Sequence, residues 1–212
     1  MKRPARGGAA TDDGAAALIA DTLAEANAAL DALRANAAAL DAVAAAGRAM
    51  VEALRRGGRV FSCGNGGSMC DAMHFAEELS GRYRDDRRAL AAVAISDPGH
   101  LTCVANDYGY EAVFSRYIEA HGRGGDCLLA ISTSGSSRNV LAAASAAKAL
   151  GMTVVALTGR AGAPLGDAAD IVICTLAGRY ADRVQELHIK IIHILIGLIE
   201  RALFSDDRGD TR

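Results

Sequence analysis

The chain has 212 residues, and its apolar fraction of 51% is enough for one domain with a complete core. Its formal net charge is −2, it lacks tryptophan, and only 4% of its residues are aromatic. This composition argues against nucleic acid or an anionic membrane attracted by bulk charge, and against an aromatic platform for single-stranded nucleic acid.

Cysteine usage and the apolar runs predict a cytoplasmic protein without a membrane partner. The five cysteines are scattered and form no C-x-x-C pair, which is typical of a reducing compartment. The N-terminal segment MKRPARGGAATDDGAAALIA lacks the apolar core of a signal peptide. The longest apolar run near the C-terminus, 189–199, includes Lys190 and His193 and is too short to span a bilayer.

The N-terminal part of the chain predicts a tail followed by helices. Residues 1–13 are expected to be disordered. Residues 14–56 are rich in alanine, with leucines at helical spacing on both sides of a break near Asn36. Two such helices cannot bury their apolar faces alone, so we expect them to pack on the domain or to support oligomerisation. Residues 57–205 are expected to form one domain.

Strands and helices alternate through that domain. Each predicted strand is a continuous apolar run, which is typical of a parallel sheet covered on both faces. The sequence therefore predicts an α/β three-layer sandwich with a five-stranded parallel sheet, plus the N-terminal helices. The expected strands are 60–63, 90–95, 127–131, 153–157 and 170–174. The expected helices are 67–81, 100–104, 110–121, 138–150 and 182–203, with a turn at 106–109.

A glycine-rich loop follows the first predicted strand. Gly64, Asn65, Gly66, Gly67 and Ser68 lead directly into a helix. Glycines let a ligand approach the backbone closely, and a helix N-terminus offers free N–H groups and a partial positive charge. We expect this glycine loop to hold an oxyanion or a phosphate. It does not match the dinucleotide pattern G-x-G-x-x-G, because no glycine stands at the third glycine position.

A second polar loop, the serine loop 132–137, follows the third predicted strand. It contains five hydroxyl groups and one glycine: Ser132, Thr133, Ser134, Gly135, Ser136 and Ser137. An ordinary polar turn with a capping serine is the simpler alternative, but five hydroxyls exceed what capping requires. The loop is not a Walker A motif, so we expect a phosphate held by hydroxyls and N–H groups. In a parallel sheet, both loops should lie at the same edge.

Two helices contain candidate metal or acid–base groups. His74 and Glu78 are four residues apart and can reach one ion, move a proton, or form only an exposed ion pair. The strongly apolar last helix contains Gln185, His188 and His193, and a buried polar group there needs a partner. Gln185 and His193 lie roughly 12 Å apart along an ideal helix. His193 acting across a subunit boundary therefore remains an open alternative.

Some polar and aromatic residues have a simpler interpretation. Asn106 and Asp107 fit a turn, although they follow a strand by one short helix and could reach the hydroxyls of a ligand. Asp182 fits the cap of the last helix. Four aromatic residues are predicted to be packing residues: Tyr108, Tyr110, Phe114 and Tyr117.

These motifs resemble a known family. The strand–GNGGS–helix unit followed by AISTSGSS resembles the sugar isomerase (SIS) domain. Within it, the segments CGNGGS, DAMHFAEELSGRY, AISD, NDYGY and YADRVQELHIKIIHILIGLIE resemble the phosphoheptose isomerase family. The resemblance is close over about residues 59–203 and loose over the N-terminal helices. It implies interconversion of sedoheptulose 7-phosphate and D-glycero-D-manno-heptose 7-phosphate, the first step toward nucleotide-activated heptose for lipopolysaccharide and other surface glycans.

The resemblance also implies roles for particular residues. The family's zinc ligands match His74, Glu78, Gln185 and His193, and its acid–base pair matches Glu78 and His193. Its substrate-binding residues match Asn65, Gly66, Gly67, Ser68, Glu78, Asn106, Asp107, Ser132, Thr133, Ser134, Ser137 and Gln185. The family is a cytoplasmic homotetramer with one zinc ion per subunit and sites at subunit boundaries. Met69 beside the glycine loop is apolar where relatives can have a polar residue, and it receives no role.

Aldose–ketose isomerisation passes through an enediol and needs a base, an acid and an electrophile. Glu78, His193 and zinc fit these roles, although a metal lowers the basicity of a carboxylate that it binds. The main alternative is a non-catalytic SIS module that binds the replication initiator or a phosphosugar. The initiator-binding relative lacks the carboxylate of Glu78 and a histidine at the position of His193, and both are present here.

Overall fold

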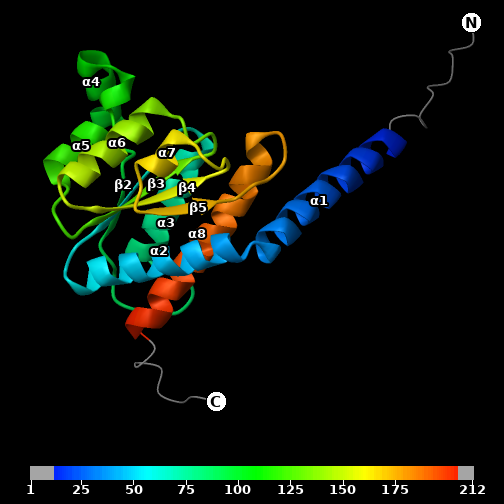
Figure 1. Ribbon diagram of the computed structural model, residues 1–212, viewed down its shortest axis with the longest axis horizontal. Coiled ribbons are helices and arrows are strands. Elements are labelled where there is room, and N and C mark those ends of the chain that lie inside the picture. Colours follow the sequence, from blue (N-terminus) through cyan, green and yellow to red (C-terminus); the bar gives the residue numbers. More distant parts are fainter. Residues whose placement is uncertain (1–11, 205–212) are drawn as a thin grey trace, which may run out of the picture.

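The computed structural model describes residues 12–204, as a sheet between two layers of helices with one helix projecting from the body (Figure 1). Of the predicted tail, residues 1–11 lie outside the described part, while 12 and 13 begin the first helix. The helices are α1 Asp12–Ala35, α2 Ala37–Arg55, α3 Gly67–Ser80, α4 Pro98–Tyr108, α5 Ser115–His121, α6 Arg138–Ala149, α7 Pro164–Asp167 and α8 Ala181–Phe204, with a 3-10 turn η1 at Tyr110–Ala112. The strands are β1 Val60–Cys63, β2 Ala92–Ala94, β3 Cys127–Ser132, β4 Thr153–Thr158 and β5 Ile171–Cys174.

The sheet has the strand order β2-β1-β3-β4-β5, and every pair is parallel. The predicted five-stranded parallel sheet is therefore confirmed. Because β1 and β3 are neighbours that run in the same direction, the loops after them leave the sheet at the same edge. The glycine loop and the serine loop thus lie side by side, as the sequence predicted.

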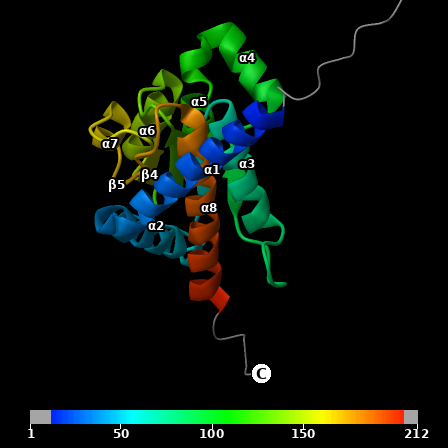
Figure 2. The same ribbon diagram turned by 90° about the vertical axis from the view of Figure 1, so that its right-hand side faces the viewer.

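Each face of the sheet packs against its own layer of helices. In β3, Cys127, Leu129 and Ile131 belong to one buried cluster, whereas Leu128 and Ala130 belong to the other. Successive side chains of a strand point to opposite faces, so two covered faces require a continuous apolar run. Helices α2, α3 and α8 cover the first face, and α4 to α7 lie on the other side (Figure 2).

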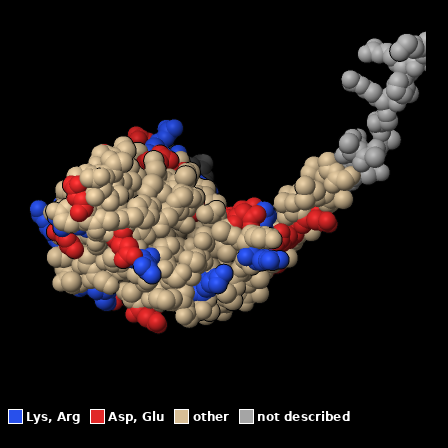
Figure 3. All heavy atoms as spheres, turned by 90° about the horizontal axis from the view of Figure 1, so that it is seen from above, with Lys and Arg blue, Asp and Glu red and all other residues tan. Residues whose placement is uncertain are grey.

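Helix α1 extends away from the sheet, and the side chain of Asn36 caps α2 by accepting a hydrogen bond from the N–H of Ala39. The predicted break near Asn36 is confirmed. Leu18, Ile19 and Leu23 of α1 are more than half exposed. Figure 3 shows α1 leaving the body, and on the face it draws, acidic and basic residues are interspersed over a mostly uncharged surface. Within the described part of the chain, no helix is long and apolar enough to cross a membrane.

The helices and turns predicted between β2 and β3 differ from those in the structure. The expected turn at 106–109 is wrong, because α4 continues through Tyr108 and ends only at Gly109, whose φ is 87°. The helix begins early because Asp97 caps it and Pro98 occupies its first turn. The helix expected at 110–121 is divided into η1 and α5. Helix α7 is a four-residue turn that apolar periodicity cannot detect.

Candidate active site

The side chains of three predicted metal-ligating residues lie close together where α3 packs against α8. His74 Nε2 lies 3.0 Å from His193 Nε2 and 3.2 Å from Glu78 Oε1, and His193 Nε2 lies 3.8 Å from Glu78 Oε2. We call these three residues the metal-ligand cluster. All come from one chain, so the contact between His193 and His74 needs no second subunit. The carboxylate is more buried, with 15% of its side chain exposed against 39% for each imidazole.

The metal-ligand cluster has the donors that a zinc ion needs. One ligand atom from each residue can be chosen so that all lie within 4.8 Å of one another. The separations of 3.0 and 3.2 Å are close to the edge of ~3.3 Å that zinc–nitrogen distances of about 2.0–2.1 Å give a tetrahedron. Glu78 Oε2 is buried without a hydrogen-bond partner among the described residues, and such a group calls for a cation or a proton. The residues present therefore fit a divalent metal.

Tyr83 completes the surroundings of His193. The two rings are stacked, with centroids 5.7 Å apart and planes 19° apart, while His74 meets the same imidazole edge-on at 5.1 Å. Tyr83 follows the end of α3 and is half-buried. Sequence reasoning missed its role, and the only available signal was an aromatic residue just beyond the end of a ligand-bearing helix.

Gln185 lies apart from the other predicted ligands. Its side-chain amide rests against Gly67, where an added Cβ would collide with Nε2. Gly67 opens α3, about two helical turns before His74. The structure therefore brings three of the four predicted metal ligands together and places Gln185 at the glycine loop. Gly67 is needed here for close packing rather than for an unusual φ.

The amide of Asn65 is held by neighbours rather than left free for a ligand. Asn65 and Asn139 exchange two hydrogen bonds of 2.8 Å through their side-chain amides, and Tyr110 donates to Asn65 Oδ1 at 2.9 Å. Asn139 is buried in the first turn of α6. These contacts fix the glycine loop to the helix that follows the serine loop, and Gly66 turns the chain with a φ of 56°.

The aromatic residues near this loop fit the predicted packing role only in part. Tyr108 and Tyr110 were predicted to be packing residues, but both are mostly exposed, and Tyr110 makes a polar contact with the glycine loop. The prediction holds for Phe114, which is fully buried, and for Tyr117, whose ring packs on that of Phe61. Sequence reasoning also missed Asn139, because asparagine near the start of a helix is common on solvated surfaces.

The hydroxyls of the serine loop converge. Ser132 Oγ lies 3.0 Å from Ser137 Oγ and 3.4 Å from Ser134 Oγ, and it accepts a hydrogen bond from the N–H of Gly135. Ser137 occupies the N-cap position of α6, yet its side chain makes no capping hydrogen bond. The alternative of a simple capping turn therefore does not describe this serine. Gly135 has a φ of 64°, which the tight turn requires.

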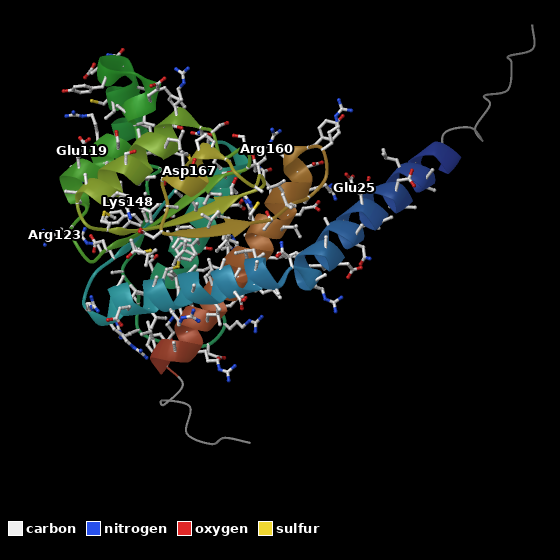
Figure 4. All side chains as sticks on the ribbon, viewed as in Figure 1. Glu25, Glu119, Arg123, Lys148, Arg160 and Asp167 are labelled. Atoms are coloured by element: carbon white, nitrogen blue, oxygen red, sulfur yellow. The ribbon has the colours of Figure 1, made fainter. Side chains whose placement is uncertain are left out.

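A cavity of about 450 Å³ adjoins the serine loop. Thr133 and Ser134 line it from one loop, and Arg160 and Arg179 line it from the loops after β4 and β5. Arg160 lies beyond the carboxyl end of β4, on the side where α8 begins (Figure 4). Hydroxyls and two guanidinium groups around one cavity favour an anion.

Three other candidates lie outside these contacts. Asn106 and Asp107 are exposed near the end of α4, where the amide of Asn106 donates to Asp107 Oδ1 and Cys103 Sγ lies 3.7 Å from Asp107 Oδ2. Asp182 is in the first turn of α8 and accepts from the N–H of Arg183. The structure brings none of them to the metal-ligand cluster.

Two buried titratable groups flank the site. Asp71 is one turn before His74, and burial raises its pKa to about 6 although the nearby imidazole opposes the shift. His188 of α8 is fully buried, and burial lowers its pKa to about 4, an effect that the backbone of Thr158 partly offsets. Burial therefore shifts the pKa of each group in the direction that favours its neutral form.

The fold and the two loops define a class of protein. The family model of the SIS domain matches residues 16–159 of this chain. That match, together with the parallel sheet and the neighbouring polar loops, places the chain in the SIS-domain family.

Comparison with named relatives shows to which group within the SIS-domain family the chain belongs. The phosphoheptose isomerase of Tolumonas auensis is 56% identical over 186 residues, which cover 88% of this chain and 97% of the relative. That of Cytophaga hutchinsonii is 60% identical over 163 residues, covering 77% of this chain and 85% of the relative. The solved structure of a phosphoheptose isomerase from Francisella tularensis superposes with a TM-score of 0.80 at 34% identity, covering 89% of this chain and 98% of the other. Within the SIS-domain family, the chain belongs to the phosphoheptose isomerases.

Proposed function

We propose that this protein isomerises sedoheptulose 7-phosphate to D-glycero-D-manno-heptose 7-phosphate, the first step of nucleotide-activated heptose biosynthesis for surface glycans, including lipopolysaccharide. The observation that supports this best is the 3.8 Å separation between Glu78 and His193, in a chain that also has two polar loops suited to an anion and is 56% identical to a phosphoheptose isomerase over 186 residues. A non-catalytic SIS module would not need this acid–base pair.

The phosphate is proposed to bind at the serine loop. The converging hydroxyls of Ser132, Ser134 and Ser137, with Thr133 on the adjoining cavity, offer donors to a dianion at the start of α6. Arg160 and Arg179 add positive charge to the same cavity.

The sugar is proposed to extend from the serine loop along the backbone of Gly66, Gly67 and Ser68 at the start of α3. Because Glu78 lies eleven residues beyond Gly67, roughly 16 Å along the helix, the Glu78 and His193 that act on this sugar are proposed to belong to a neighbouring subunit. The amide of Asn65 keeps the loop in place for this contact, because Asn139 and Tyr110 occupy it. Gln185, beside Gly67, is proposed to bind sugar hydroxyls as well. Asn106 and Asp107 remain proposed contacts for the distal hydroxyls.

Glu78 is proposed to remove the proton from C1 of the ketose. His193 donates a proton to O2 as the enediol forms, and then accepts the proton of O1 as the C1 carbonyl forms. Glu78 returns its proton to C2, so the aldose leaves with all atoms balanced. The partly buried carboxylate and its partly exposed imidazole partner suit these roles, because each is within reach of the other.

His74, Glu78 and His193 are proposed to hold one zinc ion per subunit, whereas Gln185, which lies at the glycine loop, is left to the substrate. When bound, zinc would supply positive charge that polarises the oxygens at C1 and C2. His74→Ala removes one imidazole ligand and should lower the metal content, measured by elemental analysis. Partial recovery of activity with added zinc would mean that the ion mainly orients the substrate.

The protein is proposed to be a cytoplasmic homotetramer. Apolar residues remain exposed on α1 and α8, including Leu18, Leu23, Ile194 and Leu198, and apolar faces of this extent are uncommon on monomers. Light scattering at micromolar concentration should give four times the chain mass. A monomeric mass would reject the assembly.

The direct test is incubation of the purified protein with sedoheptulose 7-phosphate, followed by NMR detection of an aldose. We expect the anomeric signals of a heptose 7-phosphate to appear, with Glu78→Gln as the matched control that lacks them. Sedoheptulose 7-phosphate that binds unchanged would favour the phosphosugar-binding module instead, and failure to bind at all would reject both.

A further inference from the structure

The segment between α3 and β2 contains one buried arginine, Arg87. Its side chain is only 4% exposed, and its Nε donates to Glu200 of α8 at 2.9 Å. The same guanidinium donates from Nη2 to the carbonyl of Glu78 at 2.6 Å and from Nη1 to the carbonyl of Gly81 at 2.8 Å. One side chain therefore joins the end of α3 to the end of α8.

These carbonyls lie where an α-helix leaves its acceptors without intrahelical partners. A guanidinium suits the position, because its donors are fixed in a fork and its charge faces the negative end of the helix. A surface lysine could supply such a cap at little cost. Here the cation is buried, is paired with a carboxylate that is 13% exposed, and bonds to the backbone of Glu78 itself.

The partner of Arg87 is related to His193 by the geometry of α8. Glu200 follows His193 by seven residues, which is about two helical turns and returns to the same face. That face of α8 therefore presents His193 to the carboxylate of Glu78 and presents Glu200 to the guanidinium of Arg87. The backbone and the side chain of Glu78 are both fixed against one helix.

We propose that Arg87 is a positioning residue that holds Glu78 in register with His193 and thereby sets the geometry of the metal-ligand cluster. The inference rests on the proposed metal-assisted isomerase function. Arg87 touches neither the substrate nor the reacting atoms; it acts through the carbonyl of Glu78 and through Glu200. Misplacement of a catalytic group by about 1 Å can lower the rate by two orders of magnitude. The hydrogen bond from Arg87 to the backbone of Glu78 is therefore expected to affect the rate.

The test is a cobalt titration of the full-length protein, followed by the visible absorption of bound Co²⁺. Arg87→Met keeps the apolar stem but removes every donor, and we expect roughly 10–100-fold weaker Co²⁺ affinity, as for other residues that support metal ligands. Arg88→Met is the matched control, because Arg88 is exposed and its guanidinium lies over the ring of Phe204. It should bind Co²⁺ like the parent. Arg87→Met with parental affinity and an unchanged spectrum would overturn the proposal.

A double variant separates positioning from folding. Removing both partners of a buried ion pair is often neutral for stability, so Arg87→Met/Glu200→Met should unfold near the parental temperature. Its Co²⁺ affinity and its kcat for sedoheptulose 7-phosphate should stay low, with little change in KM. Full recovery of affinity together with stability would show that Arg87 is only structural and would overturn the proposal.

The same experiment distinguishes this inference from the proposed function. A parent that binds Co²⁺ but does not isomerise sedoheptulose 7-phosphate would refute the proposed function, while the comparison of cobalt affinities would still measure Arg87. A parent that binds no Co²⁺ would overturn the positioning role together with the metal site.

Discussion

In the metal-ligand cluster every polar side chain projects from a long helix, whereas in the serine loop the polar groups come from the last residue of β3 and the five residues between β3 and α6. His74, Glu78 and His193 are fixed by the packing of α3 on α8. The serine hydroxyls mainly contact one another and the local backbone. Packed helices hold reacting groups within narrow limits, while a turn rich in hydroxyls and N–H groups adapts to an anion.

This difference leads to separate expectations for the two regions. Changes in the metal-ligand cluster should lower kcat and leave KM nearly unchanged, because the reacting groups are used most strongly in the transition state. Changes in the serine loop should raise KM, because the phosphate is held alike in the ground state and the transition state.

The largest effect is expected for the acid–base pair. Glu78→Gln keeps the shape and one ligating oxygen but removes the base, and His193→Gln removes the imidazole. Each should lower kcat by roughly 10²–10⁴-fold while KM changes little, as steady-state kinetics with sedoheptulose 7-phosphate would measure. The double variant should lose less than the product of the single losses, because residues that act as a unit are non-additive. Full additivity would mean that the two residues act independently.

The next effect is expected for the serine loop. Replacing Ser132, Thr133 and Ser134 together with alanine removes donors to the phosphate, each worth roughly 1.5–3 kcal/mol when the acceptor is charged. We expect a rise in KM of roughly 10²-fold or more, with a smaller change in kcat and in unfolding temperature. Calorimetric binding of sedoheptulose 7-phosphate equal to that of the parent would place the phosphate elsewhere.

A smaller effect is expected where the two loops are joined. Asn139→Leu removes the reciprocal amide pair and leaves the half-buried Asn65 with Tyr110 alone, at a cost of about 1–3 kcal/mol in the free energy of unfolding. The glycine loop should then become more mobile, and KM should rise several-fold. Hydrogen exchange of the 64–68 amides would report the change. Protection unchanged from the parent would show that the amide pair does not order the loop.

The smallest expected effect on catalysis concerns pH, which acts here through the stability of the fold. An unfolded histidine titrates near pH 6.5, whereas burial lowers the pKa of His188 in the folded protein to about 4. Between these values the unfolded state binds more protons, so stability falls as the pH falls from about 6.5 to 4, by at most ~3 kcal/mol. Asp71, with a pKa raised to about 6, contributes with the opposite sign over part of this range.

The variant His188→Leu isolates that contribution. Urea unfolding at pH 7.5 and at pH 5 should give a smaller loss of stability on acidification for this variant than for the parent. Equal losses in both proteins would show that His188 does not remain neutral in the folded state.

Local patterns predicted much of this structure. Continuous apolar runs predicted the five strands, and the polar segments after β1 and β3 were correctly expected to lie at one edge of the sheet. The spacing of His74 and Glu78 placed both on one face of α3, but it could not show that His193 meets them, because that contact joins positions 119 residues apart.

The supporting residues were beyond sequence reasoning for the same reason. Arg87 meets Glu200 across 113 positions, and Asn139 meets Asn65 across 74. Arginine in a charged turn and asparagine near a helix start are common on solvated surfaces, so residue type alone did not predict that Arg87 and Asn139 are buried. The extent of α4 was missed because its cap, Asp97, and the following proline also fit an ordinary turn.

The most direct test of the account is proton exchange during turnover in D₂O. The parent protein, incubated with sedoheptulose 7-phosphate, should form the aldose with deuterium at C2 and should return deuterium to C1 of the recovered ketose, both visible by NMR. Glu78→Gln should do neither, while still binding the sugar phosphate. A Glu78→Gln protein that exchanges and isomerises at the parental rate would contradict the central claim and would assign the base to another group.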